Sequence, residues 1–255
     1  MTSHVLTETK DRIARIELNR AEKRNALTAE MYQALADALR AAEADAQVRA
    51  VLIHGHAECF CSGNDLKDFL DNPPHSDASP VFQFLQAISR AGKPLLAAVG
   101  GAAVGIGTTM LLHCDLVYAT AEARFQLPFI SLGLVPEAAS SLLLPMIAGH
   151  QRAAELLLLG KPFDSAKALA AGIVTEVVPK EDLLDRARAA AAHIAALPPA
   201  QMRLTKSLMK KRHAVAVQEQ MREEGVLFRE LLGSPEAKEA MNAFLEKRKP
   251  DFSKF

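Results

Sequence analysis

The chain has 255 residues and a formal net charge of zero, with 30 basic and 30 acidic residues. This balance argues against a general binder of nucleic acid or of anionic membranes. Hydrophobic residues make up 49% of the chain and charged residues 24%, which is typical of one large globular domain, with or without an appendage.

Cysteine use and apolar runs indicate the compartment. Cys59, Cys61 and Cys114 form no even disulfide framework, which favours a reducing environment. No apolar run reaches the length of about 18 residues that a transmembrane span needs. The N-terminus lacks the basic-then-apolar order of a signal peptide, so we expect a cytoplasmic protein.

The N-terminal part predicts a hairpin, a helix and a strand. Two alternating apolar runs within residues 4–18 are typical of a hairpin of half-buried strands. Thr28 is suited to cap a helix whose apolar residues recur at helical spacing to about Ala46. The apolar run 48–54 then predicts a buried strand.

Strand and helix patterns alternate from there to residue 178, which predicts an α/β fold with right-handed crossovers. A polar, proline-rich surface loop is expected at 71–80, and a loop lining a cavity at 125–136. Pro145 should kink or end the helix in which it lies. The remaining predicted elements are an extended segment at 60–62, a short helix from Asp65, a helix at 81–91, strands at 95–99 and from Asp115, helices at 137–144 and 151–159, and a strand at 172–179.

From residue 180 onward the patterns are helical only, with helices expected at 181–196, 199–212, 216–232 and 234–247. We therefore predict a core at 1–195 and a C-terminal helical region at 196–255. The basic cluster 206–213 is typical of a solvated helix face. RNA binding is its alternative interpretation.

Residues 94–120 carry four glycines, at 100, 101, 105 and 107, between a strand-like run and an apolar run of helix length. So many glycines are costly unless the backbone needs positive φ or must approach something closely. A dinucleotide-binding motif is disfavoured, because no third glycine follows Gly105-Ile106-Gly107 at the required spacing. The stretch predicts either an oxyanion site made of backbone N–H groups or simple close packing of helix on strand.

A second glycine turn lies at Cys61-Ser62-Gly63-Asn64-Asp65, again between an extended segment and a short helix. The N–H groups of Asn64 and Ile106 could point at one substrate carbonyl oxygen. Two such donors stabilise an enolate, which makes the neighbouring carbon more acidic.

Five segments resemble, in order, the signatures of the crotonase superfamily, the enoyl-CoA hydratases and isomerases. They are NRAEKRNAL at 19–27, CFCSGNDL at 59–66, the block 94–119, LGLVPEAASS at 132–141 and AGIVTEVV at 171–178. The resemblance implies an α/β spiral of ββα units with a C-terminal helical trimerisation region. It also implies a homotrimer or a dimer of trimers, and an acyl-CoA thioester as substrate. Coenzyme A is then part of the substrate, and neither a separate cofactor nor a metal is expected.

The resemblance also implies catalytic roles. It assigns the oxyanion amides to Asn64 and Ile106. The two glutamates that position water in hydratases fall on Thr109 and Phe129, neither of which can act as a base. Glu137 remains, and the SGNDL and PEAASS segments resemble the peroxisomal-type Δ3,Δ2-enoyl-CoA isomerases, whose base is a glutamate at this place.

One carboxylate suffices to shift a double bond, and an apolar surrounding would raise the pKa of Glu137 and strengthen it as a base. Alternatively, Glu137 only complements the dipole of a helix that starts there. Three other functions stay open: hydration by a non-standard water site, another thioester reaction, and a scaffold that binds CoA esters or RNA without chemistry.

For coenzyme A, the resemblance implies contacts on both glycine-turn and C-terminal segments. Alternatively, Asp65 only caps a helix, and the basic residues among these contacts are only solvated side chains. The implied contacts are Lys23, Arg24, Ala26 and Leu27 at the pantetheine and phosphate end, Ser62, Asp65 and Leu66 near the adenine, and Phe244 and Lys247 toward coenzyme A on a neighbouring subunit.

Overall fold

In the computed structural model, which describes residues 4–56, 58–74, 76–246 and 248–255, the strands form two sheets. The larger sheet has the strand order β1-β2-β3-β5-β7-β10, and the smaller one has the order β4-β6-β8-β9. All neighbours are parallel except β1 with β2 and β8 with β9. The strands are β1 (Val5–Lys10), β2 (Ile13–Leu18), β3 (Ala50–His54), β4 (Cys59–Cys61), β5 (Leu95–Val99), β6 (Ala102–Val104), β7 (Leu116–Thr120), β8 (Arg124–Gln126), β9 (Phe163–Asp164) and β10 (Glu176–Val178).

The chain winds between the two sheets as a spiral. Strands β3, β5 and β7 lie side by side in the larger sheet, and each is followed directly by a strand of the smaller sheet, β4, β6 or β8. Helical structure then returns the chain to the larger sheet, so that the unit ββα repeats. This is the spiral that the resemblance implied.

Most predicted helices are present with similar bounds. The hydroxyl of Thr28 accepts a hydrogen bond from the N–H of Met31 at 3.3 Å, which confirms its capping role. Helix α7 was not predicted from the sequence. The helices are α1 (Ala29–Ala44), α2 (Leu66–Asp71), α3 (Pro80–Arg90), α4 (Ile106–Thr109), α5 (Ser140–Ala148), α6 (His150–Leu159), α7 (Ser165–Ala170), α8 (Leu183–Ala196), α9 (Pro199–Lys211), α10 (Ala214–Leu232) and α11 (Pro235–Leu245).

The glycine stretch differs from its prediction. An additional strand, β6, stands between β5 and the helix, and the helix itself is one turn of α4 continued by a 3₁₀ turn at Met110–His113. Gly101 makes the link between the two strands possible. Its φ is +61°, and a Cβ there would lie 1.8 Å from the carbonyl oxygen of Glu58. A strand of three residues is too short to show a period in the sequence.

Two predictions between residues 125 and 148 were also wrong. The expected cavity-lining loop begins inside strand β8, and Phe125, Leu127 and Phe129 are buried in the core. Helix α5 starts at Ser140 rather than at Glu137. Of the two outcomes expected at Pro145, a kink or an end, the helix does not end there but continues to Ala148. A proline removes one hydrogen bond of the helix ladder, and the buried residues Leu144 and Ala148 on either side keep the helix packed.

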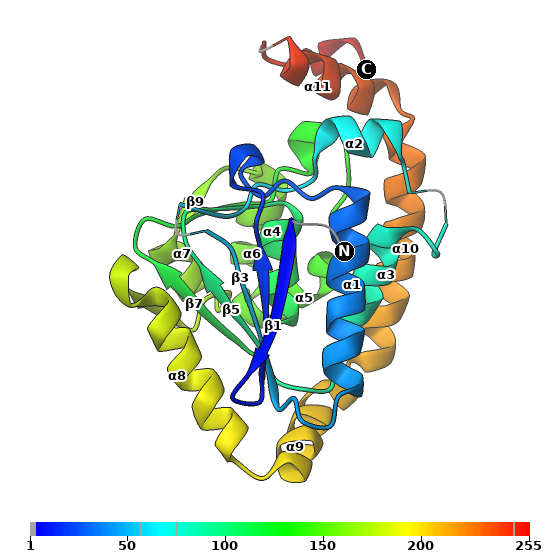
Figure 1. Ribbon diagram of the computed structural model, residues 1–255. Helices are drawn as coiled ribbons and strands as arrows, with labels where there is room; N and C mark the ends of the chain where they lie inside the picture. The colour runs from blue at the N-terminus through cyan, green and yellow to red at the C-terminus, as the bar shows by residue number, and fades with distance from the viewer. Residues whose placement is uncertain (1–3, 57, 75, 247) are drawn as a thin grey trace.

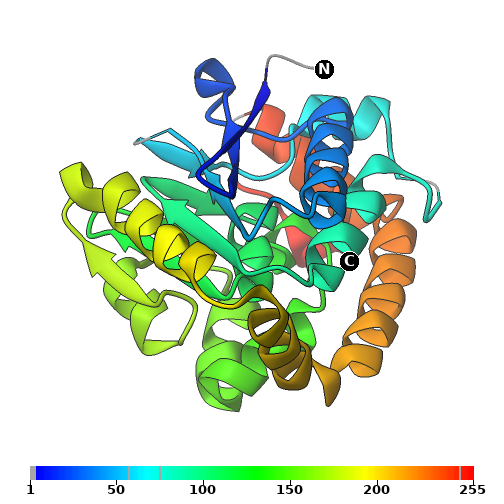
Figure 2. The same ribbon diagram turned by 60° about the horizontal axis from the view of Figure 1, so that its bottom comes forward.

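The larger sheet separates two hydrophobic clusters. Helix α8 covers one face of this sheet (Figures 1 and 2). The other face packs against α1, α3 and the smaller sheet in the main core. The α8 cluster consists of Ile13, Ala50, Leu52, Leu96, Ala98, Tyr118, Val178, Leu183, Ala187, Ala191 and Ala195.

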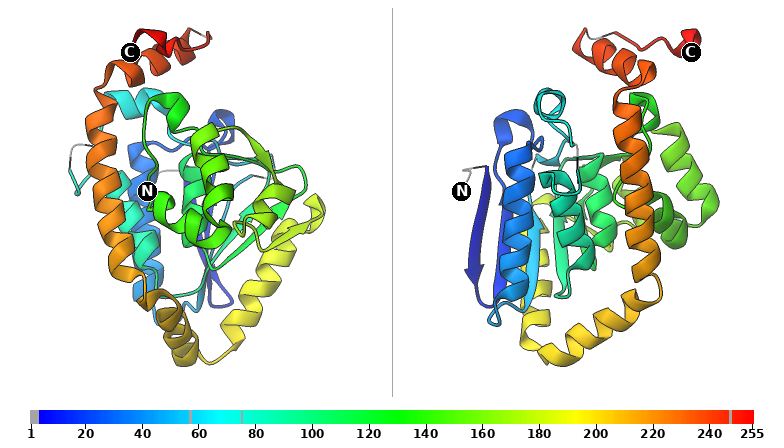
Figure 3. Two further views of the ribbon diagram at one scale, coloured as in Figure 1. Left: turned by 180° about the vertical axis from the view of Figure 1, so that it is seen from behind. Right: turned by 90° about the vertical axis from the view of Figure 1, so that its right-hand side faces the viewer.

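The C-terminal helices run around the edge of this body. Helix α9 crosses the end of the sheets, α10 returns along the side opposite α8, and α11 projects beyond it (Figures 1 and 3). Helix α11 packs on the turn Ile130–Leu132. Among the described residues, no helix combines the length and the apolar character that crossing a membrane requires.

Lysines of the basic cluster 206–213 anchor α9 to the body. Lys206 is 5% exposed, and its ammonium donates to the Asp115 carboxylate at 2.6 Å and to the Lys93 carbonyl at 2.7 Å. Lys210 donates to the carbonyl of Ser89 near the end of α3 at 2.6 Å. The prediction of a solvated face was therefore wrong for these two lysines, and the basis for RNA binding is weaker.

We expect Lys206→Met to lower the free energy of unfolding by about 3 kcal/mol, because it leaves the partly buried Asp115 carboxylate without its cation. Urea unfolding followed by circular dichroism measures the change. Lys211→Met is the control, because Lys211 lies on the same helix and is exposed. It should change the stability by no more than about 0.5 kcal/mol. Equal stability of the two variants would contradict a structural role for Lys206.

Candidate active site

Two glycine turns lie against each other at the edge of the smaller sheet. A Cβ on Gly107 would lie 2.5 Å from the carbonyl oxygen of Cys61, and one on Gly63 would lie 3.2 Å from that of Val104. Gly63 also has a φ of +99°. The two backbones can therefore approach only because neither turn carries a side chain there.

The amides predicted to bind an oxyanion are free of partners within the described residues. Around Asn64, the Gly63 carbonyl and the Asp65 N–H both bond Leu27, which leaves the Asn64 N–H without an acceptor. Ile106 is the first residue of α4, where an N–H has no partner within its own helix. Both groups are therefore able to donate to a bound anion.

Tyr32 is a polar residue of this region that the sequence analysis missed. Its hydroxyl donates to the side-chain oxygen of Asn64. Tyr32 is 2% exposed, and burial, with a contribution from the Glu137 charge, raises its pKa well above the usual value. The phenol therefore stays a neutral donor that fixes the Asn64 side chain. In the sequence, Tyr32 belongs to the apolar stripe of α1 and is not distinguished from core residues.

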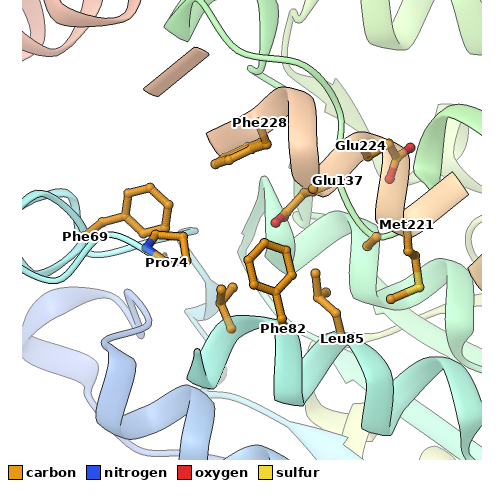
Figure 4. A pocket seen from close by; sticks show the side chains of 11 residues that line it. Phe69, Pro74, Phe82, Leu85, Glu137, Met221, Glu224 and Phe228 are labelled. Atoms are coloured by element: carbon orange, nitrogen blue, oxygen red, sulfur yellow. The ribbon is translucent and has the colours of Figure 1, made fainter. Parts of the chain in front are cut away.

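Glu137 points into a small apolar pocket (Figure 4). Its side chain is nearly buried, and Oε1 accepts a hydrogen bond from the Thr109 hydroxyl at 3.3 Å. Burial, followed by the nearby charge of Glu224, raises the pKa of Glu137 to about 8. The pocket has a volume of about 20 Å³, enough for roughly one water molecule. Its lining residues are Phe69, Pro74, Val81, Phe82, Leu85, Glu137, Ala138, Met221, Glu224, Gly225 and Phe228.

Glu137 does not serve the helix dipole. Helix α5 begins at Ser140, and it is Glu224 of α10 that accepts hydrogen bonds from the N–H groups of Ala139 and Ser141, at 2.6 and 3.0 Å. The alternative role that we considered for Glu137 therefore belongs to Glu224. Glu224 is the second functional candidate missed from the sequence, where it resembles any charged residue of a helix.

Comparison with known proteins identifies the family of the chain. The family model for enoyl-CoA hydratase/isomerase matches residues 8–254. The chain belongs to the enoyl-CoA hydratase/isomerase family. Its members act on acyl-CoA thioesters, and the α/β crotonase fold expected from the sequence is confirmed.

Similar proteins carry both hydratase and isomerase names. A probable enoyl-CoA hydratase of Rhizobium meliloti is 35% identical, and the match covers 97% of each chain. The human enoyl-CoA delta isomerase 2 is 37% identical over 84% of this chain and 57% of its own length. The crystal structure of an enoyl-CoA hydratase/isomerase from Pseudoalteromonas atlantica is 44% identical. It superposes with a TM-score of 0.95 over 98% of this chain and all of that one.

The segment around residues 20–27, predicted to contact coenzyme A, is fixed next to the second glycine turn. Lys23 and Arg24 are exposed, while the Asn25 side chain is fully buried. The Asn25 amide donates to the carbonyls of Cys59 and Phe60 at 3.0 and 3.1 Å. The two basic side chains are therefore available to a ligand on a well-anchored turn.

Several other residues that were predicted to contact coenzyme A already make contacts within the protein. Asp65 caps α2 and also pairs with Arg20 at 2.8 Å, so its simpler role is present. Leu27 is buried, and both of its backbone polar groups are bonded. Ser62 and Leu66 are half-buried beside them, and the Ala26 carbonyl accepts from Arg20 at 2.9 Å. Phe244 lies in α11, but its side chain and all of Lys247 are outside the described residues.

We expect Gly107→Ala to lower kcat/KM by about 10²–10³, because the new methyl group would force the turns apart and remove an oxyanion donor. Steady-state turnover of an enoyl-CoA measures this loss. Gly233→Ala is the matched control, because its Cβ would lie 3.7 Å from the nearest atom. Wild-type turnover by a folded Gly107→Ala protein would show that the contact between the turns is not needed.

Proposed function

We propose that this enzyme is a Δ3,Δ2-enoyl-CoA isomerase in which Glu137 moves the proton. One observation carries the proposal. Among the described residues that line the pocket, Glu137 presents a carboxylate whose only hydrogen bond is the 3.3 Å contact from Thr109. The other carboxylate there, that of Glu224, is occupied by the start of α5.

The proposed reaction needs one base and one oxyanion site. The thioester oxygen accepts hydrogen bonds from the N–H groups of Asn64 and Ile106. The Glu137 carboxylate takes a proton from C2 of the 3-enoyl chain, and the electron pair delocalises onto the thioester oxygen as a dienolate. The Glu137 carboxylic acid then returns the proton to C4, which leaves the double bond between C2 and C3. General acid–base catalysis of this kind contributes about 10²–10⁴ in rate.

The surroundings of Glu137 support a base rather than a water-positioning pair. Thr109 and Phe129 stand where the resemblance places hydratase glutamates. The Thr109 hydroxyl contacts Glu137, while Phe129 is buried in the core. Hydration of a 2-enoyl-CoA is the second candidate. The hydratase name of the Rhizobium relative favours it, as does a pocket that fits one water molecule beside Glu137.

Coenzyme A binding and assembly belong to the same proposal. We place the CoA phosphates at Lys23 and Arg24, because both are exposed cations on an anchored turn. We also expect a homotrimer or a dimer of trimers. Large apolar side chains on α9 and α10 are exposed in the single chain, which is typical of surfaces that become covered. They include Leu204, Leu208, Met209 and Val215.

We expect Glu137→Gln to lower kcat for isomerisation at least ~10²-fold, because the amide keeps the shape but cannot take a proton. The Kd for the enoyl-CoA product should change by less than about threefold. Turnover and equilibrium binding are measured on the same preparation. An active variant would rule out Glu137 as the base, whereas loss of both turnover and binding would indicate a folding defect.

The pH dependence follows from the raised pKa of Glu137. The base must be ionised, and in the free enzyme its pKa is about 8. We therefore expect kcat/KM to rise about tenfold per pH unit below pH 8 and to level off above it. The value of kcat/KM is measured from pH 5 to 9.5, and kcat is measured separately at saturating substrate. A flat profile down to about pH 5 would contradict the buried environment assigned to Glu137.

A further inference from the structure

The first turn of α5 is held by a buried carboxylate from another helix. Oε2 of Glu224 accepts from the Ala139 N–H at 2.6 Å, and Oε1 accepts from both the N–H and the hydroxyl of Ser141. Gln220, one turn earlier on α10, donates to the same hydroxyl at 3.0 Å. Glu224 is 4% exposed. Since both of its oxygens only accept, the bonding pattern is that of an ionised carboxylate.

The residues that Glu224 holds follow Glu137 directly and have an unfavourable backbone. Ala138 and Ala139 have φ values of 61° and 55°. Two consecutive alanines adopt this left-handed conformation only where their surroundings enforce it. The His113 ring donates to the Ala138 carbonyl at 2.8 Å, and the Ser140 hydroxyl donates to the Glu137 carbonyl at 2.6 Å. The direction of the Glu137 side chain therefore depends on a turn that is fixed from outside.

We propose that Glu224 is a positioning residue for Glu137, because its carboxylate holds the left-handed turn that directs the Glu137 side chain into the pocket. Figure 4 shows the two side chains from different elements, with Glu137 pointing toward Phe82 and the Glu224 oxygens pointing away from it. The inference rests on the proposed function only in treating Glu137 as the base. The contacts that carry it do not involve a substrate.

The charge of Glu224, like its position, supports Glu137 as a base. The positive end of α5 would otherwise stabilise an anion beside it and weaken Glu137 as a base. The Glu224 charge offsets this end and, after burial, is the second cause of the raised pKa of Glu137. Tyr32 from α1 and Cys61 from β4 also face Glu137, and burial raises the pKa of both, so they stay neutral. The charge that faces Glu224 on its own helix is the exposed Glu223.

The test compares Glu224→Gln with Glu223→Gln, which removes the same charge from the adjacent, exposed position. Glu137 is titrated directly by NMR of protein labelled with ¹³C at the glutamate carboxyl carbons, and its signal is assigned from Glu137→Gln. The pH profile of kcat/KM and the separate values of kcat and KM are measured for each variant. The NMR titration needs no turnover, so it tests this inference even if the wild-type enzyme shows no isomerase activity.

In Glu224→Gln we expect the Glu137 titration and the acid limb of kcat/KM to move by about 1 pH unit to lower pH. We also expect kcat to fall about tenfold, clearly less than in Glu137→Gln, with KM within twofold, because the base is displaced and weakened but still present. Glu223→Gln should match the wild type in every measurement. An unchanged Glu137 titration in Glu224→Gln would overturn the proposal. So would a loss of turnover as complete as that in Glu137→Gln, since Glu224 would then take part in the chemistry itself.

Glu224→Asp provides a second test, needed if the glutamine variant does not fold. It keeps the charge but is one methylene group shorter, so it cannot reach both N–H groups of α5 in the same way. We expect kcat to fall about tenfold, because a misplacement of the base by ~1 Å costs this much or more. The acid limb of the pH profile should stay within about 0.3 pH unit of its wild-type position, because the charge is kept. Wild-type kcat in this variant would overturn the positioning role.

Discussion

Direct backbone contact between two glycine turns is the constraint on which the site depends. Gly107 sits against the carbonyl of Cys61, and a side chain of any size would separate the two segments. The spiral explains how they meet, because β4 and β6 are parallel neighbours in the smaller sheet and each turn follows its strand. Two N–H groups without a partner in the described part of the chain, one from each turn, are thereby brought to the same edge of that sheet. The oxyanion hole that we propose would thus follow from the sheet order.

The carboxylates near this edge have separate tasks because their surroundings differ. Glu137 has one weak hydrogen bond and an apolar pocket, so its neutral form is favoured and it can exchange a proton. Burial raises the pKa of Glu224 as well, but the three hydrogen bonds that it accepts oppose this and favour its anion. The two carboxylates therefore differ mainly in their hydrogen bonds, which are three at Glu224 and one at Glu137 among the described residues. The long helix α10 lies outside the spiral, but through Glu224 it holds the turn that follows Glu137.

Much of the fold could be predicted from the sequence, since long apolar patterns and glycine turns are local signals. The hairpin, α1, α3 and the C-terminal helices are examples. Strands of three residues, such as β6 and β8, were missed because they are too short to show a period. Glu137 stood out as a lone carboxylate in an apolar segment. Tyr32 and Glu224 did not, because what distinguishes them is a partner distant in the chain.

Glu137 is proposed to shift a double bond in an enoyl thioester as a single buried carboxylate. The most direct test is to incubate the wild-type protein separately with a 3-enoyl-CoA and a 2-enoyl-CoA and to identify each product by chromatography and mass spectrometry. We expect the 3-enoyl-CoA to become the 2-enoyl-CoA without change of mass, and no water to be added to either substrate. A 3-hydroxyacyl-CoA formed from the 2-enoyl-CoA, with no isomerisation of the 3-enoyl-CoA, would contradict the account.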